Sequence, residues 1–298
     1  MGRSQVVTAA VTITTAVRSA ATPPELVEVV GGRGRRKGLW ARIPRPVRRL
    51  MSPALILAAW AIGSTTGLLN TDLFPPPTEV AATAWRLLGD GQLATHVGAS
   101  AIRVLTGTVL GILIGVLLAV LAGLTRTGED LLDWTMQILK AVPNFALTPL
   151  LIIWMGIGEG PKIVLITTGV AIAIYINTYS GIRGVDRQLV EMAQTLEAPR
   201  RTLISQVILP GAMPNFLVGL RLGLSSAWLS LIFAEMINTT QGIGYLMSRA
   251  QTNLQFDVSL LVIVIYAVAG LLSYTLVRVL ERLLLSWRNG FEGLGAPA

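Results

Sequence analysis

The sequence contains no cysteine, and His96 is its single histidine. Without cysteine there are no disulfide bonds and no cysteine-ligated metal sites. One histidine cannot build a zinc site, and placed in an outer loop, where we expect it, it makes a Ser-His-Asp catalytic set implausible. No acidic cluster suits Mg²⁺ or Ca²⁺. The sequence therefore predicts no metal site and no catalytic residues.

Lysine is also scarce, with three residues, and none stands in a Gly-Lys-Ser/Thr sequence. The loop that cradles nucleotide phosphates is therefore absent, and we expect this chain to bind no cofactor. The net charge of +8 is concentrated at the N-terminus and on a few loops. This distribution suits anionic lipid headgroups better than nucleic acid.

Charged residues make up only 13% of the 298 residues, and 52% are apolar. A soluble domain is about one quarter charged. The uncharged residues are clustered into stretches of 18 to 22 residues, and roughly 20 helical residues cross a bilayer core of about 30 Å. The stretches are 50–71, 104–125, 141–158, 163–182 and 258–277. We predict an all-α membrane protein.

The chain divides into a basic N-terminal segment, 1–50, disordered or peripheral, a transmembrane domain, 51–288, and a short tail, 289–298. Eight basic residues and no acidic one lie between Arg33 and Arg49, which predicts a cytoplasmic N-terminus by the positive-inside rule. Six crossings then return the C-terminus to the cytoplasm. The predicted spans are 52–69, 103–124, 131–155, 162–180, 216–236 and 258–279, and a surface helix is expected over 79–88.

Small residues recur at helical spacing in two of these spans. One ridge runs from Gly107 through Gly111 and Gly115 to Gly123, and a second contains Gly219 and Gly223. Such ridges let another helix approach closely, either within this chain or in a second subunit.

Proline interrupts the third predicted span at Pro143 and Pro149, close to Lys140. Neighbours must satisfy the carbonyls that proline frees in a membrane helix. Arg221 and Glu235 both lie in or beside the fifth span. They are 14 residues apart, about 21 Å along a helix, so they cannot pair with each other, and we expect each near an opposite membrane interface.

The polar segment 183–214 separates two spans. It predicts a short helix over 190–197 and a second over 202–209 that Pro210 ends. These two helices form either a compact cytoplasmic knob or an ordinary solvated loop.

The segment also carries a motif: Glu191-Met192-Ala193, then Glu197, then Val207-Ile208-Leu209-Pro210. It resembles the Glu-Ala-Ala…Gly…Ile-x-Leu-Pro motif of permease subunits of binding-protein-dependent ABC importers. The chain departs from it at Met192, at Glu197 in place of glycine, and at Val207. The family glycine permits a tight turn, so with glutamate we expect a turn built from ordinary backbone angles.

Other stretches look like the nitrate/sulfonate/taurine branch of this family, and residues 175–178, 181–183 and 189–193 are closest to aliphatic sulfonate permeases. The stretches that look like the branch are 74–77, 154–159 and 242–246. The resemblance covers residues 53–288 and implies the type I ABC importer permease fold.

The resemblance implies that two permease copies form the pore, that two ATP-binding subunits carrying ATP and Mg²⁺ dock from the cytoplasm, and that a separate extracytoplasmic protein delivers an aliphatic sulfonate. The knob would be the coupling helix, docked in a groove of the ATPase. The residues assigned to coupling are Glu191, Met192, Ala193, Leu196, Glu197, Leu203, Ile204, Leu209, Pro210 and Gly211.

A sulfonate is a permanent anion and needs donors or a modest positive field along its path. The candidates in or near spans are Lys140, Asn144, Thr148, Asn177, Tyr179, Ser225, Ser226 and Trp228. Each of them could instead serve helix packing. Three other functions stay open. They are import of taurine, nitrate, another small anion or a thiamine precursor, a membrane enzyme, and a channel or scaffold without ATP coupling.

Overall fold

The computed structural model describes residues 45–237 and 239–285, and every regular element in these ranges is helical. The prediction of an all-α protein is confirmed for this part of the chain. Residues 1–44 and the predicted tail, 289–298, lie outside the described ranges. The chain forms two compact units that divide between Ile56 and Leu57, and the second contains every helix from α4 onward.

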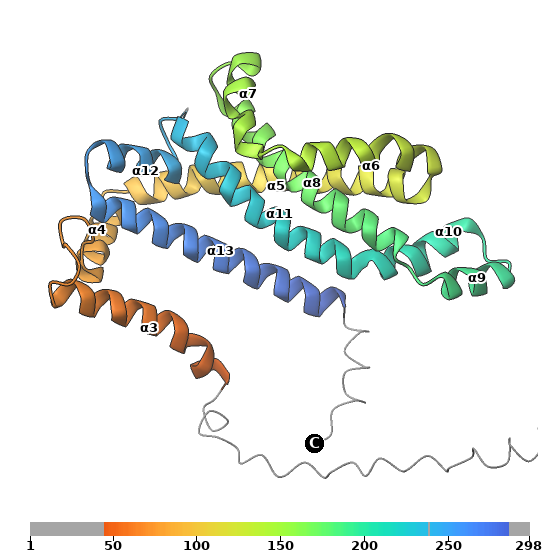
Figure 1. The fold of residues 1–298 in the computed structure, drawn as a ribbon, viewed down its shortest axis with the longest axis horizontal. Helices are drawn as coiled ribbons and strands as arrows, with labels where there is room; N and C mark the ends of the chain where they lie inside the picture. Colours follow the sequence, from red (N-terminus) through yellow and green to blue (C-terminus); the bar gives the residue numbers. More distant parts are fainter. Residues whose placement is uncertain (1–44, 238, 286–298) are drawn as a thin grey trace, which may run out of the picture. The chain divides into compact units, whose positions relative to one another are not determined.

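Helix α3 begins at Arg45, inside the segment that the sequence assigned to a basic tail. The helices are α3 (Arg45–Thr65), α4 (Pro77–Gly89), α5 (Gln92–Leu124), α6 (Arg126–Ala141), the 3₁₀ turn η1 (Asn144–Leu147), α7 (Thr148–Met155), α8 (Glu159–Arg183), α9 (Arg187–Thr195), α10 (Arg200–Thr202), the π-helical turn η2 (Leu203–Ile208), α11 (Leu209–Ile237), α12 (Ile243–Thr252) and α13 (Phe256–Leu284) (Figure 1).

Among the described residues, four helices are long and apolar enough to cross a membrane: α5, α8, the continuous helix Arg200–Ile237, and α13. Helix α6 and the segment Asn144–Met155 qualify together as a fifth crossing, but they meet at a 90° bend. The apolar helix Met51–Thr65 overlaps the predicted first span, 52–69, and is shorter. The sixth crossing therefore stays a prediction.

The bend in the third predicted span lies at Val142 and Pro143, as Pro143 predicts. Both residues have extended ψ angles, 124° and 116°. Pro149 was expected to break the span as well, and this is wrong. It lies in the first turn of α7, where a missing N–H costs no helical hydrogen bond.

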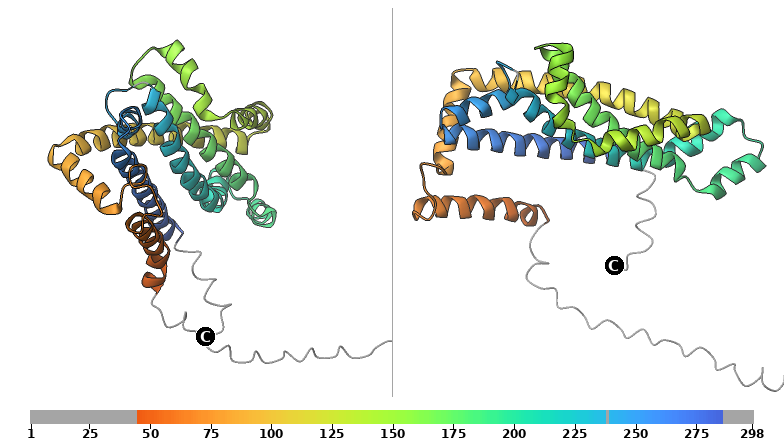
Figure 2. Two further views of the ribbon diagram at one scale, coloured as in Figure 1. Left: turned by 60° about the vertical axis from the view of Figure 1, so that its left-hand side comes forward. Right: turned by 45° about the horizontal axis from the view of Figure 1, so that its top comes forward.

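Helix α8 packs between α5 and α11, side by side with both (Figures 1 and 2). The first small-residue ridge faces α8: a Cβ atom at Gly111 would lie 2.6 Å from the Val170 side chain and 2.9 Å from the Thr167 carbonyl oxygen. The second ridge faces α8 from the opposite side, where a Cβ atom at Gly219 would lie 2.9 Å from Asn177. Both ridges therefore serve packing within this chain.

The two ends of α11 differ in their surroundings. Segments α9 and α10 lie at one end, whereas α4 and α12 lie at the other (Figure 1; Figure 2, right). At the α4–α12 end, a cluster containing Val80, Ala250 and Leu261 joins α4, α12 and α13. Helix α4 matches the predicted surface helix, while α12 lies between the fifth and sixth predicted spans, where no helix was predicted.

Replacing Gly111 by leucine should weaken the contact between α5 and α8, because the new side chain overlaps Val170 and the α8 backbone. Such overpacking costs about 1–3 kcal/mol. The thermal unfolding midpoint in detergent, measured by tryptophan fluorescence, should fall. Gly98→Leu on the same helix is the control, since a Cβ atom there meets nothing within 4 Å. Equal midpoints for the two variants would contradict this packing.

Candidate functional site

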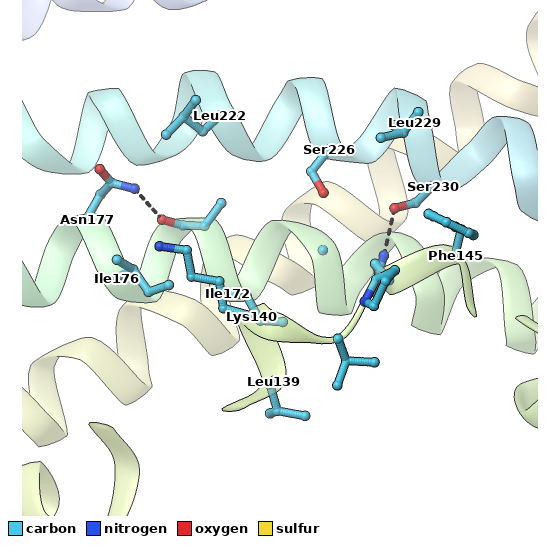
Figure 3. A pocket seen from close by; sticks show the side chains of 15 residues that line it. Leu139, Lys140, Phe145, Ile172, Ile176, Asn177, Leu222, Ser226, Leu229 and Ser230 are labelled. Carbon is cyan, nitrogen blue, oxygen red and sulfur yellow. Dashed lines mark hydrogen bonds between the residues drawn. The ribbon is translucent and has the colours of Figure 1, made fainter. Parts of the chain in front are cut away.

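A cavity of about 380 Å³ lies where the α6–η1 bend meets α8 and α11. Figure 3 shows its polar side chains coming from all three sides. Its lining residues are Leu139, Lys140, Val142, Pro143, Asn144, Phe145, Gly169, Ile172, Ala173, Ile176, Asn177, Leu222, Ser226, Leu229 and Ser230. We call this cavity the bend pocket.

Polar groups in the bend pocket are held by short hydrogen bonds. The Asn144 amide donates to Ser230 Oγ at 2.7 Å and to the Leu165 carbonyl at 2.9 Å, and Asn177 donates to the Ala173 carbonyl at 2.8 Å. A Cβ atom at position 169 would lie 2.6 Å from Ser226 Oγ. Glycine at this position therefore keeps the pocket open beside these groups.

Lys140 is the charged side chain of the bend pocket. It lies in the last turn of α6, and in Figure 3 it extends towards Asn177. The pocket thus combines one ammonium, amides and hydroxyls with apolar walls from α8 and α11. This arrangement can hold a small anion that carries an apolar tail.

Four of the residues proposed for a translocation path line the bend pocket: Lys140, Asn144, Asn177 and Ser226. The structure adds Ser230, which the sequence analysis missed. Its position one helical turn after Ser226 is the signal that could have identified it.

The other four candidates lie elsewhere. Thr148 is buried and donates to the Phe145 carbonyl, and Tyr179 donates to Glu129. Ser225 and Trp228 line a separate cavity of about 160 Å³ between α11 and α13, where Trp228 Nε1 donates to Ser273 Oγ. Helical periodicity explains the separation, because adjacent residues on α11 point to different faces.

Glu235 belongs to a buried ionic cluster that the sequence did not reveal. Its side chain is completely buried, and its carboxylate accepts from Arg103 at 2.6 Å, from Ser100 at 2.8 Å and from the Gly244 N–H at 2.9 Å. Arg103 also binds Glu159 on α8 with two nitrogens. Glu235 therefore lies inside the helix bundle, and its expected position near a membrane interface stays a prediction.

Two further polar residues of the spans have partners on distant elements. His96 was expected in a loop, but it lies in α5, where its Nδ1 accepts from the Gly242 N–H. Arg221 pairs with Glu281 on α13.

The polar segment 183–214, which we call the coupling segment after its predicted role, begins with a short helix, α9, over Arg187–Thr195, slightly earlier than predicted. Asp186 caps it by accepting from the Gln188 N–H, and Glu191 pairs with Arg187 at 2.8 Å. Ala193 is buried, whereas Met192 and Leu196 are exposed. The knob therefore presents apolar side chains on its outer face.

Glu197 adopts a left-handed conformation with φ of 53°, so the expectation of ordinary backbone angles is wrong. The Ala198 N–H donates to the Ala193 carbonyl, and the Glu197 N–H donates to the Gln194 carbonyl. These two bonds are those of a Schellman C-cap, which usually places glycine at this position. The turn is thus the one that glycine favours, formed here by glutamate.

Pro210 was expected to end the second short helix, and this is also wrong. The helix runs unbroken from Arg200 to Ile237 through Pro210 and Pro214. The preceding turn, Leu203–Ile208, is π-helical. Its wider hydrogen-bond spacing accommodates the proline, which has no N–H to donate.

The remaining residues that the resemblance assigned to coupling lie along this turn and the start of α11. Leu203 and Ile204 are partly buried, and Leu209 is exposed. A Cβ atom at Gly211 would lie 3.0 Å from Val185, in the link between α8 and α9.

Glu197→Gly should stabilise α9, because a left-handed residue with a Cβ atom costs about 1–2 kcal/mol. Hydrogen exchange of the α9 amides, followed by mass spectrometry, should slow. Glu191→Gly is the opposite control, because glycine inside a helix costs about 1 kcal/mol, and exchange should speed up. Faster exchange in the Glu197→Gly variant would contradict the Schellman cap.

The family model described as binding-protein-dependent transport system inner membrane component matches residues 94–286. The putative aliphatic sulfonates transport permease protein SsuC of Bacillus subtilis (strain 168) is 40% identical over 247 residues, covering 83% of this chain and 90% of its own length. The protein of the same name in Escherichia coli (strain K12) is 43% identical over 240 residues, covering 80% and 91%. The taurine transport system permease protein TauC of Escherichia coli (strain K12) is 32% identical over 241 residues, covering 79% and 88%.

Among solved structures, a chain of an amino acid ABC transporter crystallised with histidines superimposes with a TM-score of 0.56 at 14% identity, covering 68% of this chain and 97% of that one. This likeness confirms the predicted importer-permease fold. With a family model matching 94–286 and relatives at 40–43% identity, the chain belongs to the family of binding-protein-dependent transport system inner membrane components.

Proposed function

We propose that this chain is the permease subunit of an ATP-driven importer that carries aliphatic sulfonates across the cytoplasmic membrane. The observation that carries the proposal is the pair of relatives named as aliphatic sulfonates permeases, at 40% and 43% identity over 83% and 80% of this chain. Transport, rather than catalysis, is the role of the family's membrane component.

The chemistry of the bend pocket supports an anionic ligand with an alkyl group. Lys140 offers a positive charge, and Ser226 and Ser230 offer hydroxyl donors. Ile172, Ile176 and Leu222 form apolar walls. The volume of about 380 Å³ falls within the roughly 300–1,000 Å³ of small-molecule sites. No Asp or Glu is among the described residues that line the pocket, so the Lys140 ammonium can attract an anion, and a single charge still lets the anion leave.

The proposed assembly contains two copies of this permease, two ATP-binding subunits that hold ATP and Mg²⁺, and an extracytoplasmic substrate-binding protein. Both termini lie in the cytoplasm in this arrangement. The knob at α9 then faces the ATP-binding subunits, and its exposed Met192 and Leu196 supply the apolar contact. ATP binding draws the two knobs together, and the packed helices rock as near-rigid bodies.

Taurine is the second candidate, favoured by the relative named as a taurine permease at 32% identity. Taurine is also a sulfonate, but it carries an ammonium group. The positively charged ammonium of Lys140 repels the ammonium of taurine, and the apolar walls of the bend pocket do not solvate it. We therefore propose alkanesulfonates as the first candidate substrate and taurine as the second.

Lys140→Gln should weaken sulfonate transport, because the pocket loses its charged group. We expect an increase in KM of about tenfold, equivalent to about 1.4 kcal/mol. The measurement is uptake of labelled pentanesulfonate into proteoliposomes that contain the complete importer, with taurine and nitrate as competitors. Lys140→Arg keeps the charge and serves as the control.

Three outcomes would contradict the proposal. An unchanged KM in the Lys140→Gln variant would show that the bend pocket does not lie on the translocation path. Stronger competition by taurine or nitrate than by unlabelled pentanesulfonate would show that the stronger competitor is the preferred substrate. Uptake without ATP would indicate a channel.

Glu191→Lys should uncouple transport from ATP hydrolysis, because it reverses the charge on the exposed face of α9 and breaks the pair with Arg187. Sulfonate uptake should fall about tenfold, within the usual range of coupling free energies, while membrane insertion stays normal. Glu79→Lys, the same reversal on exposed α4, is the control. Normal transport by the Glu191→Lys variant would show that α9 is not the ATPase contact.

A further inference from the structure

One face of α6 carries a stripe of residues that runs from the coupling segment to the bend pocket. Glu129, Asp133, Met136 and Lys140 follow each other at spacings of three or four residues, so they share one side of the helix. Met136 is buried and packs in one cluster with Tyr175 of α8 and Ala122 of α5. The stripe is therefore the side of α6 that rests on the helix bundle.

Glu129, at one end of the stripe, binds the last turns of α8. Its carboxylate pairs with Arg183 and accepts a hydrogen bond of 2.8 Å from the Tyr179 hydroxyl. Arg183 is the final residue of α8, and α9 begins four residues later at Arg187. A movement of α9 along or across the bundle therefore reaches Arg183 through a very short stretch of backbone.

Lys140, at the other end of the stripe, projects into the bend pocket. No ion pair of Lys140 occurs among the described residues, so the position of its ammonium depends on how α6 lies. Glu129 and Lys140 are separated by 11 residues, about 16 Å of helix. Directly after Lys140 and Ala141, the extended pair Val142 and Pro143 allows α6 to turn relative to η1.

We infer that Glu129 is a positioning residue that couples the α9 segment to the Lys140 ammonium in the bend pocket. When α9 moves, Arg183 moves with it, and the Glu129 carboxylate makes α6 follow. Helix α6 then pivots at Val142 and Pro143, and Lys140 shifts along the pocket wall. This inference rests on the proposed importer function, because the ATP-binding partner supplies the movement of α9.

The strength of the contact suits this role. The side chains of Arg183 and Glu129 are 42% and 37% exposed, so water screens the pair, and such pairs contribute about 0–1 kcal/mol to stability. A contact of this size can direct α6 without being needed for folding. Glu129→Gln removes the charge and keeps an acceptor for Tyr179, so the variant should insert and fold normally.

The test measures the position of α6 directly. Because the chain has no cysteine, spin labels can be placed at Ile138→Cys on α6 and Leu113→Cys on α5, whose side chains are 63% and 62% exposed. Pulsed electron resonance on the complete importer compares the nucleotide-free and ATP-bound states. We expect a distance shift in the labelled parent that is mostly lost when Glu129→Gln is added.

Transport gives the second readout. Glu129→Gln should lower sulfonate uptake about tenfold, a typical coupling effect, while ATP hydrolysis stays within about twofold of the parent. Asp130→Asn removes the neighbouring exposed carboxylate and is the matched control, expected to behave as the parent in both assays. The exchange Glu129→Arg with Arg183→Glu should restore the distance shift and uptake.

The inference is overturned if the label distance does not respond to ATP in the parent, or if it responds equally in the Glu129→Gln variant. Parallel loss of ATP hydrolysis and uptake, without rescue by the charge exchange, would make Glu129 a structural residue only. The label experiment needs no sulfonate. A parent that shows the distance shift but takes up no sulfonate would therefore refute the proposed substrate and leave this coupling intact.

Discussion

A lipid bilayer supplies little hydrophobic force between helices, because acyl chains are as apolar as leucine. The packing of α8 between α5 and α11 therefore depends on close van der Waals contact, which glycine at 107, 111 and 115 on α5 and at 219 on α11 makes possible. Two consequences follow from this fit. The opposing ridges leave α8 little freedom to shift sideways, and the α8 face between them, at Gly169 and Asn177, remains available to line the bend pocket.

The coupling segment departs from the ideal geometry of its elements at two places. Glu197 takes a left-handed conformation, and Leu203–Ile208 forms a π-helical turn in front of Pro210. A short helix of nine residues has little stability of its own. Its shape is held instead by the Schellman hydrogen bonds, by the burial of Ala193 and by the packing of Gly211 on Val185. Contacts at its base thus hold the knob in place, and Met192 and Leu196 on its outer face are exposed.

Local properties of the sequence predict much of this structure. Apolar length predicts α5, α8, the helix ending at Ile237, and α13, and the four-residue spacing of glycines predicts which face of α5 is packed. Pairings between distant residues are not encoded locally. The contact of Glu235 with Arg103 joins positions 132 residues apart, and the separation of Ser225 from Ser226 depends on which α11 face meets α8. The geometry at Glu197 could not be inferred from residue type, because the hydrogen bonds of the turn outweigh the preference of glutamate.

The polar contacts at the two ends of the helix bundle differ in strength, because one ion pair is buried and the other is partly exposed. Glu235 is fully buried, and removing one partner of such a buried pair costs about 3–5 kcal/mol. Arg103 binds it together with Glu159, so buried ionic contacts join α5, α8 and α11 near the α4–α12 end. The pair between Glu129 and Arg183 is partly exposed, and such a pair contributes about 1 kcal/mol or less to stability. A buried ionic cluster therefore holds one end of the bundle, and a partly exposed ion pair holds the end that leads to α9. The coupling that we infer, from α9 through α6 to the bend pocket, depends on this difference.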